Sequence, residues 1–273
     1  MASIPHIPDR AVILAAGLGS RLRPLTAAIP KPLIPVHGVP ILHNALSALA
    51  ANGVRKATVV VGYRHDAIRA ACGSRFAGID VSYVESAVFA HTGSAYSLWL
   101  ARDALADGDA LLLEGDVLFE PSVLARLLAS PPGDAAAVAP FVDGMTGSAV
   151  TLGRDHAIEA VLMNQTASSG AGAALFKTMN LFRFTADRLR HALLPALYDF
   201  VGKGAVTAYL EQVLADLIAG GLRLTAVECG DLRWFEIDSE ADLRIAETIF
   251  AGAAQSARPG SAPAPHALQV AEG

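Results

Sequence analysis

Residues 11–33 read AVILAAGLGSRLRPLTAAIPKPL, and this stretch says most about the fold and the function of the chain. Its first part, Ala11–Leu14, is a short apolar run that predicts a buried strand. The strand ends in a glycine loop, where Gly17 and Gly19 allow the backbone to pass close to a ligand. Exposed backbone amides in such a loop form a cradle for an anion. The stretch therefore predicts a phosphate site at the end of the first strand.

Two cations follow the loop. Arg21 offers a planar fork of donors that fits phosphate oxygens, and Lys31 offers a compact point charge. Together they could neutralise a triphosphate and the charge that develops on its α-phosphorus during attack. The chain lacks the GxxxxGK[ST] pattern of a Walker loop, and Leu22 stands where a dinucleotide fingerprint needs its third glycine. The plainer alternative is a tight turn with surface cations.

The string GxGxRLxPLT…KPL resembles the signature of the nucleoside-triphosphate transferase family, which includes the sugar-1-phosphate nucleotidyltransferases. The resemblance runs from about Ala11 to Phe250. It implies that the arginine and the lysine of the motif bind the triphosphate and act in catalysis. The residues that it places around the nucleotide here are Leu14, Ala15, Ala16, Gly17, Gly19, Ser20, Arg21 and Lys31.

Short apolar runs alternate with amphipathic segments along the chain, which predicts an α/β protein. We expect a Rossmann-like, mostly parallel mixed sheet with helices on both faces, of the nucleotidyltransferase (GT-A-like) type. A single domain would cover residues 1–251, with a substrate-covering insertion at about 144–172, and residues 252–273 read as a disordered Ala/Pro tail. The expected strands are 11–14, 57–61, 81–84, 110–113, 135–139, 178–184 and 222–227, and the expected helices are 41–52, 94–105, 186–201, 209–219 and 239–250.

Carboxylates cluster at two places. Glu114 and Asp116 follow a predicted buried strand, and Glu236 and Asp238 precede the last predicted helix. Ligands of parallel sheets bind where the carboxyl ends of the strands meet. Asp116 and Asp238 are the predicted Mg²⁺ ligands, since hard carboxylate oxygens suit that ion. Alternatively, they are a turn residue and a helix cap.

Four further strings narrow the resemblance to one group within the family. The strings YSLWLA (residues 96–101), LLLEGDVLFE (111–120), KTMNLFRF (177–184) and WFEID (234–238) are similar to cytidylyltransferases that act on phosphocholine or on phosphonates such as 2-aminoethylphosphonate. In those relatives the lysine of the KT-N stretch binds the phosphoryl group of the acceptor, which implies that role for Lys177. The start of a helix at Thr92, Gly93 and Ser94 favours an anion or a base edge, and with Glu114 these residues complete the predicted nucleotide site. The predicted acceptor residues are Lys177, Asn180, Tyr209, Glu211, Trp234 and Glu236. The aromatic and acidic residues among them belong to a wider group with Tyr198, Asp199 and Phe235. That group would serve equally well as packing between helices.

This chain departs from those relatives at two places. It has His91-Thr92-Gly93-Ser94 where they usually carry an NTNN-like run, and Met145-Thr146-Gly147 where they often have an aspartate. The missing carboxylate weakens the case for an aminoethyl or choline head group. A hydroxyalkyl phosphonate or a phosphorylated amino-acid derivative stays open as the acceptor.

Composition limits the class of protein. Of the 273 residues, 53% are hydrophobic and 17% are charged, and the net charge is −5, without a Lys/Arg run. We therefore expect a globular protein that binds neither nucleic acid nor an anionic membrane, because both partners need a basic patch. The first ten residues lack the apolar core of a signal peptide, and Cys72 and Cys229 lack metal-ligand spacing, so we expect reduced cysteines and a cytoplasmic location. A homodimer stays open.

The residues together predict a Mg²⁺-dependent cytidylyltransferase that joins CMP from CTP to a small phosphonate or phosphorylated acceptor and releases pyrophosphate. The first alternative is a sugar-1-phosphate nucleotidyltransferase that uses UTP or dTTP. It would need side chains that read hydroxyls in the insertion, where Glu159, Asn164 and Gln165 are the candidates. The second alternative is a catalytically silent regulatory relative that binds nucleotide.

Overall fold

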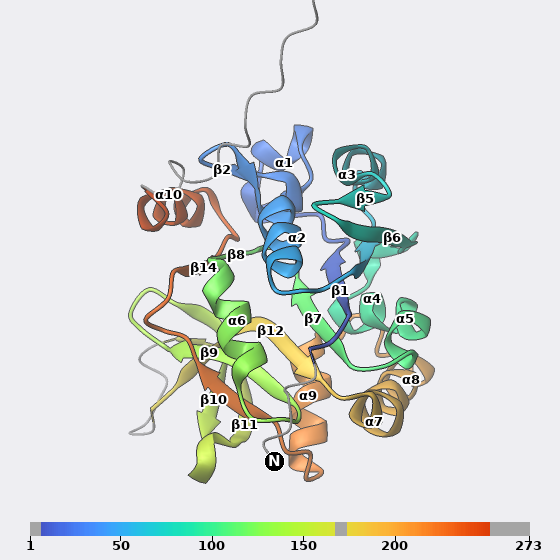
Figure 1. Ribbon diagram of the computed structural model, residues 1–273, viewed down its shortest axis with the longest axis vertical. Helices are drawn as coiled ribbons and strands as arrows, with labels where there is room; N and C mark the ends of the chain where they lie inside the picture. Colours follow the sequence, from blue (N-terminus) through green and yellow to red (C-terminus); the bar gives the residue numbers. More distant parts are fainter. Residues whose placement is uncertain (1–6, 167–173, 252–273) are drawn as a thin grey trace, which may run out of the picture.

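The computed structural model describes residues 7–166 and 174–251 and is built around one large sheet (Figure 1). Four neighbouring strands at its centre are parallel, and antiparallel strands continue it on both sides, which confirms the predicted α/β class. From edge to edge the order is β11 (Ile158–Thr166), β10 (Thr146–Leu152), β12 (Phe176–Phe184), β7 (Ala110–Glu114), β1 (Arg10–Ala15), β4 (Lys56–Val61), β6 (Ile79–Glu85) and β5 (Arg75–Phe76), with β9 (Ala135–Pro140) on β12 and β13 (Thr225–Glu228) on β9.

Strand β1 lies between β4 and β7 and is buried on both faces. Side chains alternate along a strand, so its residues divide between two hydrophobic clusters. Ala11 and Ile13 belong to the cluster on one face, whereas Val12 and Leu14 belong to the cluster on the other. This explains why the strand reads as an unbroken apolar run in the sequence.

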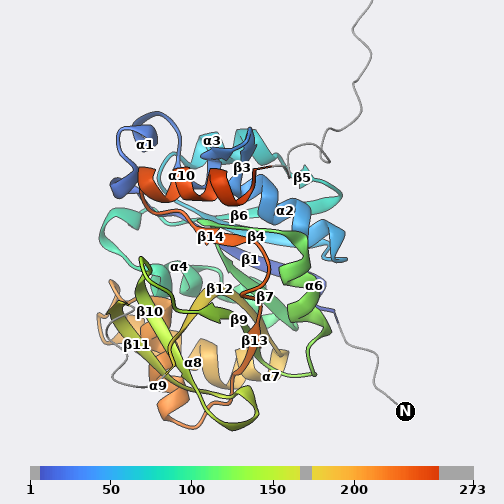
Figure 2. The same cartoon turned by 90° about the vertical axis from the view of Figure 1, so that its left-hand side faces the viewer.

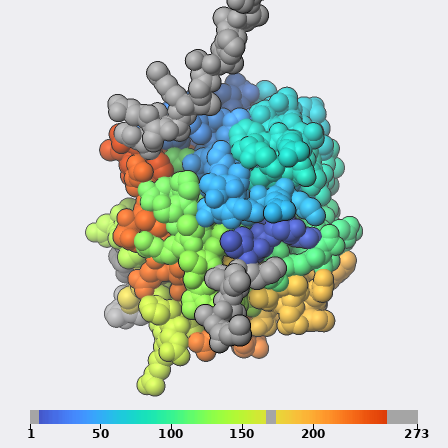
Figure 3. All heavy atoms as spheres, viewed as in Figure 1, coloured from blue at the N-terminus to red at the C-terminus, as the bar shows by residue number. Residues whose placement is uncertain are grey.

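Helices cover both faces of the sheet. The first cluster includes residues of α2 (Ile41–Ala51), α3 (His65–Cys72) and α6 (Pro121–Ala129). In the space-filling view, the blue segment of α2 lies between the teal segment of α3 and the green segment of α6 (Figure 3). The second cluster includes residues of α4 (Ser94–Leu100), α5 (Arg102–Ala106), α9 (Leu210–Ala219) and the continuous helical stretch from α7 (Ala186–Arg188) through a π-helical turn (Leu189–Leu193) to α8 (Leu194–Gly202).

The last helix, α10 (Glu240–Ile249), packs against the segment that follows the glycine loop (Figure 2). A third cluster joins Phe250 and Ile237 to Leu22 and Ile34. Ser239 caps the helix, because its hydroxyl accepts a hydrogen bond from the amide of Asp242. The packing brings Asp238, at the entrance of the helix, next to the loop.

The structure differs from the predicted elements at a few places. The predicted helix 94–105 is broken at Ala101, where α4 ends. The ψ angle of Ala101 is 12°, and its amide donates a hydrogen bond to the Leu98 carbonyl, three residues back instead of four. The last predicted strand begins only at Thr225, and the insertion forms the strands β10 and β11. Helices α3 and α6 were not predicted. Residues 167–172 of the predicted insertion and the proposed tail 252–273 lie outside the described residues, and the single-domain organisation stays a prediction.

No helix in the described part of the chain is long and apolar enough to cross a membrane.

Candidate active site

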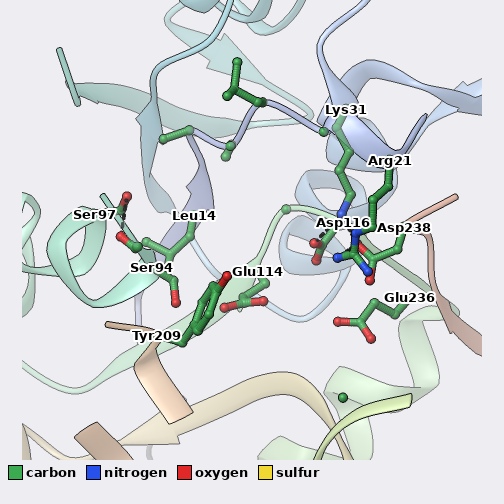
Figure 4. Close-up of a pocket in the computed structure, with 18 of the residues that line it drawn as sticks. Leu14, Arg21, Lys31, Ser94, Ser97, Glu114, Asp116, Tyr209, Glu236 and Asp238 are labelled. Carbon is green, nitrogen blue, oxygen red and sulfur yellow. Dashed lines mark hydrogen bonds and ion pairs between the residues drawn. The ribbon is translucent and has the colours of Figure 1, made fainter. Parts of the chain in front are cut away.

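A cavity of about 490 Å³ lies at the carboxyl ends of β1 and β7 (Figure 4). It gathers residues from segments that lie far apart in the sequence, as expected where parallel strands end. The structure brings almost all of the predicted site residues to its wall, namely Leu14, Ala15, Ala16, Gly17, Gly19, Ser20, Arg21, Lys31, Thr92, Gly93, Ser94, Glu114, Asp116, Lys177, Tyr209, Glu211, Glu236 and Asp238.

The glycine loop is shaped by Gly19, whose φ of 60° lies in the left-handed region. A Cβ atom at this position would lie 2.8 Å from the Cβ of Lys31, so a larger residue would displace that lysine. The hydroxyl of Thr26 donates a hydrogen bond to the Gly19 carbonyl at 2.9 Å and closes the loop. The loop and Lys31 therefore form one packed unit on the cavity wall.

Lys31 lies between the two aspartates that are the predicted Mg²⁺ ligands. Its Nζ is 2.8 Å from Oδ2 of Asp116 and 2.6 Å from Oδ1 of Asp238. Arg21 adds a second cation, with Nη2 2.9 Å from the same Asp238 oxygen. The Lys31 side chain is 12% exposed and that of Arg21 is 70% exposed, so Arg21 is free to turn toward a ligand.

The ion pairs shift the titration of this group. Burial works to lower the pKa of Lys31, but Asp116 and Asp238 outweigh it and raise that pKa above its ordinary value. Burial likewise works to raise the pKa of Asp238, and the cations Lys31 and Arg21 outweigh it and lower that pKa. At neutral pH Lys31 therefore carries its positive charge, as phosphate binding needs, and Asp238 carries its negative charge.

Lys177, from β12, forms a second cationic group in the same cavity. Its side chain is 7% exposed, and Nζ lies 2.8 Å from Oε2 of Glu236. It also donates a hydrogen bond to the Thr146 carbonyl at 3.1 Å. A Cβ atom at Gly147 would lie 3.0 Å from this Nζ, so Lys177 fills the space beside the turn at residues 145–147.

Glu211, from the first turn of α9, supplies a carboxylate on another part of the wall. It accepts a hydrogen bond from the Ser148 hydroxyl at 3.3 Å, and no cation pairs with it within the described residues. Tyr209, at the N-cap of α9, is 58% exposed beside it. Ser148 and Met163 also line the cavity, although neither was predicted to do so. The pairing of their strands, β10 and β11, has register shifts, so the sequence pattern does not reveal which side chains face a ligand.

Two predicted acceptor residues lie elsewhere. Trp234 is 8% exposed and packs in the core beside α2 and α6, with its strand β14 (Trp234–Glu236) paired to β8 (Val117–Phe119). Asn180 is 4% exposed and lies behind the cavity wall. From the wider group, Tyr198 packs against the Trp99 ring and Asp199 pairs with Lys203. None of these four predicted residues lines the cavity.

The carboxylates fit a divalent cation. Oxygen atoms of Glu114, Asp116 and Glu236 lie within 4.8 Å of one another, and Oδ1 of Asp116 is buried without a hydrogen-bond partner in the described residues. Burial and the neighbouring carboxylates raise the pKa of Glu114 well above its ordinary value, and burial raises that of Glu236 despite Lys177. A second positive charge near Asp116 would relieve this repulsion, and oxygen donors are those that Mg²⁺ prefers.

Comparison with known proteins gives a consistent result. Residues 10–130 match the family described as "Nucleotidyl transferase". The chain is 38% identical over 246 residues to the CMP-5'-(3-aminopropyl)phosphonate synthase of Streptomyces rubellomurinus, which covers 89% of this chain and 39% of that protein. It is 36% identical over 113 residues to the 2-aminoethylphosphonate cytidylyltransferase of Lancefieldella rimae, covering 40% of this chain and 43% of that protein. Each match thus covers less than half the length of the relative.

Among solved structures, the CTP:phosphocholine cytidylyltransferase from Streptococcus pneumoniae matches with a TM-score of 0.71 at 22% identity. The match covers 88% of this chain and 98% of that one. At this identity the likeness shows the fold, and it agrees with the order of layers described above.

Proposed function

Since this chain carries a domain of the nucleotidyl transferase family, we propose that it is a cytidylyltransferase that joins CMP from CTP to a small phosphonate. The observation that carries the proposal is the presence of two separate cationic groups in one cavity. Arg21 and Lys31 come from the glycine loop, and Lys177 comes from β12. One group suits a triphosphate and the other an anionic acceptor.

The reaction needs little covalent chemistry from the protein. An ionised oxygen of the acceptor attacks the α-phosphorus, and a new P–O bond forms as the bond to the β-phosphate oxygen breaks. The electron pair of the broken bond leaves with pyrophosphate. No general base is needed, because the acceptor is already anionic at neutral pH. The task of the cavity is to hold two mutually repelling anions in line.

The cations and the loop meet that task. Lys31 and Arg21 neutralise the phosphates of the nucleotide, and Lys177 orients the phosphonate. We propose that Asp116 and Asp238 hold Mg²⁺; Asp238 lies outside the close set of Glu114, Asp116 and Glu236 oxygens but shares Lys31 with Asp116. When bound, the ion would supply Lewis-acid stabilisation and a template for the phosphate oxygens. Both aspartates contact Lys31, so that lysine also keeps the pair of carboxylates together before substrates bind.

The acceptor that the cavity fits best is an aminoalkyl phosphonate. Its phosphonate would pair with Lys177, and its ammonium with Glu211, which has no cationic partner within the described residues. The exposed ring of Tyr209 offers a face beside that carboxylate. The names of two relatives, one for an aminopropyl and one for an aminoethyl phosphonate, support the same class. Glu211 thus supplies the negative charge that the turn at residues 145–147 lacks.

Pyrophosphate release tests the proposal. The four NTPs are combined with Mg²⁺ and, separately, with 2-aminoethylphosphonate, 3-aminopropylphosphonate, a hydroxyalkyl phosphonate, phosphocholine and glucose-1-phosphate. We expect release with CTP and an aminoalkyl phosphonate. Release with UTP or dTTP and glucose-1-phosphate would instead identify a sugar-1-phosphate nucleotidyltransferase. Silence in the whole grid would point first to an acceptor outside it, such as a phosphorylated amino-acid derivative, and only then to the regulatory alternative.

A further inference from the structure

Asn180 has an unusual backbone conformation for a residue inside a strand. Its φ is 54°, in the left-handed region, although it lies near the middle of β12. The register of β12 against β9 is irregular there, between Thr178 and Phe182. Asparagine tolerates this region better than most residues, but the conformation still carries a cost. Local strain of this kind is a reason to ask what the side chain does.

The side chain of Asn180 links two carboxylates of the site. Its Nδ2 lies 3.2 Å from Oε2 of Glu114 and 3.2 Å from Oε1 of Glu236, and it donates to both. Its Oδ1 accepts a hydrogen bond from the Thr178 hydroxyl at 2.8 Å. An amide nitrogen has two hydrogens to donate, so this arrangement uses both. Thr178 therefore orients the amide toward the carboxylates.

Glu236 is in turn held through both of its oxygen atoms. Oε2 pairs with Lys177, and Oε1 accepts from Asn180. Residues three apart on a regular strand point to opposite faces of the sheet. The left-handed conformation of Asn180 changes this alternation, so that Lys177 and Asn180 both reach the same carboxylate.

We infer that Asn180 is a positioning residue that fixes Glu236 and, through it, aims Lys177 at the phosphonate. This inference rests on the proposed function, and it differs from a direct contact with the acceptor because Asn180 does not line the cavity. Without the amide, Glu236 keeps only its ion pair with Lys177 and can rotate about it. Lys177 then loses its fixed direction, and the acceptor binds more weakly, whereas the contacts of Arg21 and Lys31 with the nucleotide do not depend on Asn180.

Four variants test the inference. Asn180→Gly removes the amide and keeps a residue that adopts positive φ freely. Asn180→Asp keeps the shape and replaces the donor with a third carboxylate. Thr178→Val removes the hydroxyl that orients the amide. Asn52→Asp is the matched control, since Asn52 bonds the Ala48 and Pro121 carbonyls outside the cavity.

Steady-state KM values for CTP and for the acceptor are measured with each variant, together with Tm. By analogy with residues that orient a ligand-binding side chain, Asn180→Gly should raise the acceptor KM about 10- to 100-fold. Asn180→Asp should raise it more, Thr178→Val should raise it less, and in every variant the KM for CTP should rise less than the acceptor KM. A merely structural asparagine would lower Tm and leave the two KM values in their wild-type ratio.

The outcomes separate the two claims. If the wild-type enzyme transfers CMP but no folded variant at residues 178 and 180 raises the acceptor KM, the inference is overturned and the function stands. An equal rise for Asn52→Asp would overturn it too. If wild type transfers no nucleotidyl group to any acceptor, the function and the inference fall together. Should Asn180→Gly fail to fold, Asn180→Asp and Thr178→Val decide.

Discussion

Nζ of Lys31 lies 2.6 Å from Oδ1 of Asp238, although the two residues are 207 positions apart in the chain. The contact joins the segment after the glycine loop to the entrance of the last helix. The hydrophobic cluster that contains Leu22 and Ile237 supports it from behind. Because the ion pair lies on the cavity wall, the phosphate groups of a bound ligand can replace Asp238 as the partner of Lys31. The hydrophobic cluster behind the pair stays covered.

Asp116→Asn and Asp238→Asn each keep the shape of the side chain and remove its charge. Each variant should lower kcat by more than about 100-fold. Even mutation of residues that only orient metal ligands commonly lowers metal affinity or activity about 10- to 100-fold. Pyrophosphate release at saturating Mg²⁺ measures this, and circular dichroism checks the fold. Asp231→Asn, on the exposed surface beside Arg126, is the control and should remain active. A near-wild-type rate in either site variant would rule out its role at the metal.

Lys177→Met removes the charge of the second cationic group but keeps much of its length. We expect the acceptor KM to rise at least about tenfold with a small change in the KM for CTP, because charge-assisted contacts to an anion are lost at one end of the cavity. Titration of each substrate in turn gives the two constants. Lys203→Met alters an exposed lysine that pairs with Asp199, and both constants should stay unchanged. Equal weakening of both substrates by Lys177→Met would contradict the assignment.

Glu211→Gln tests the proposed ammonium partner. The variant should lose activity with an aminoalkyl phosphonate about 10-fold or more, since a hydrogen-bonded charge pair contributes roughly 1.5–3 kcal/mol. Activity with a simple alkyl phosphonate, which has no ammonium, should change little. The ratio of kcat/KM for the two acceptors is therefore the informative number. Glu247→Gln on exposed α10 is the control. A ratio that Glu211→Gln leaves unaltered would mean that Glu211 does not contact the amine.

From the two buried cysteines we predict that the free energy of unfolding decreases with rising pH in the alkaline range. Burial raises the pKa of both Cys72 and Cys229 to about 11 from an ordinary value of 9.0. Above pH 9 the unfolded chain loses these thiol protons while the folded chain keeps them, so stability falls between about pH 9 and pH 11. Urea unfolding should show a smaller loss over this range for the Cys72→Ala, Cys229→Ala variant than for wild type. Parallel losses would mean that the thiols titrate equally in both states.

Much of the site was predictable because its chemistry is concentrated in short strings. The glycine loop with Arg21 and Lys31 lies within one stretch, and Asp116 directly follows a strand whose apolar run is unmistakable. The central strands and the capped last helix were predictable for the same reason, since strict burial and a cap leave local marks. The structure brings these residues together in one cavity.

The acceptor end was harder to predict, because its geometry depends on irregular backbone. Asn180 and Trp234 were expected to contact the acceptor. Instead, the left-handed backbone of Asn180 turns its own side chain toward the carboxylates, and Trp234 packs in the core. Ser148 and Met163 lie on strands with a register shift, so their faces cannot be counted from sequence alternation. The ion pair between Lys31 and Asp238 likewise has no local signal, because it joins the two ends of the fold.

Phosphorus NMR of a single incubation with CTP, Mg²⁺ and 2-aminoethylphosphonate tests the central claim most directly. The account predicts that the phosphonate signal is replaced by two mutually coupled resonances, from a phosphonate joined to CMP, with one equivalent of pyrophosphate. An unchanged phosphonate signal, whether CTP stays intact or is only hydrolysed, would contradict it.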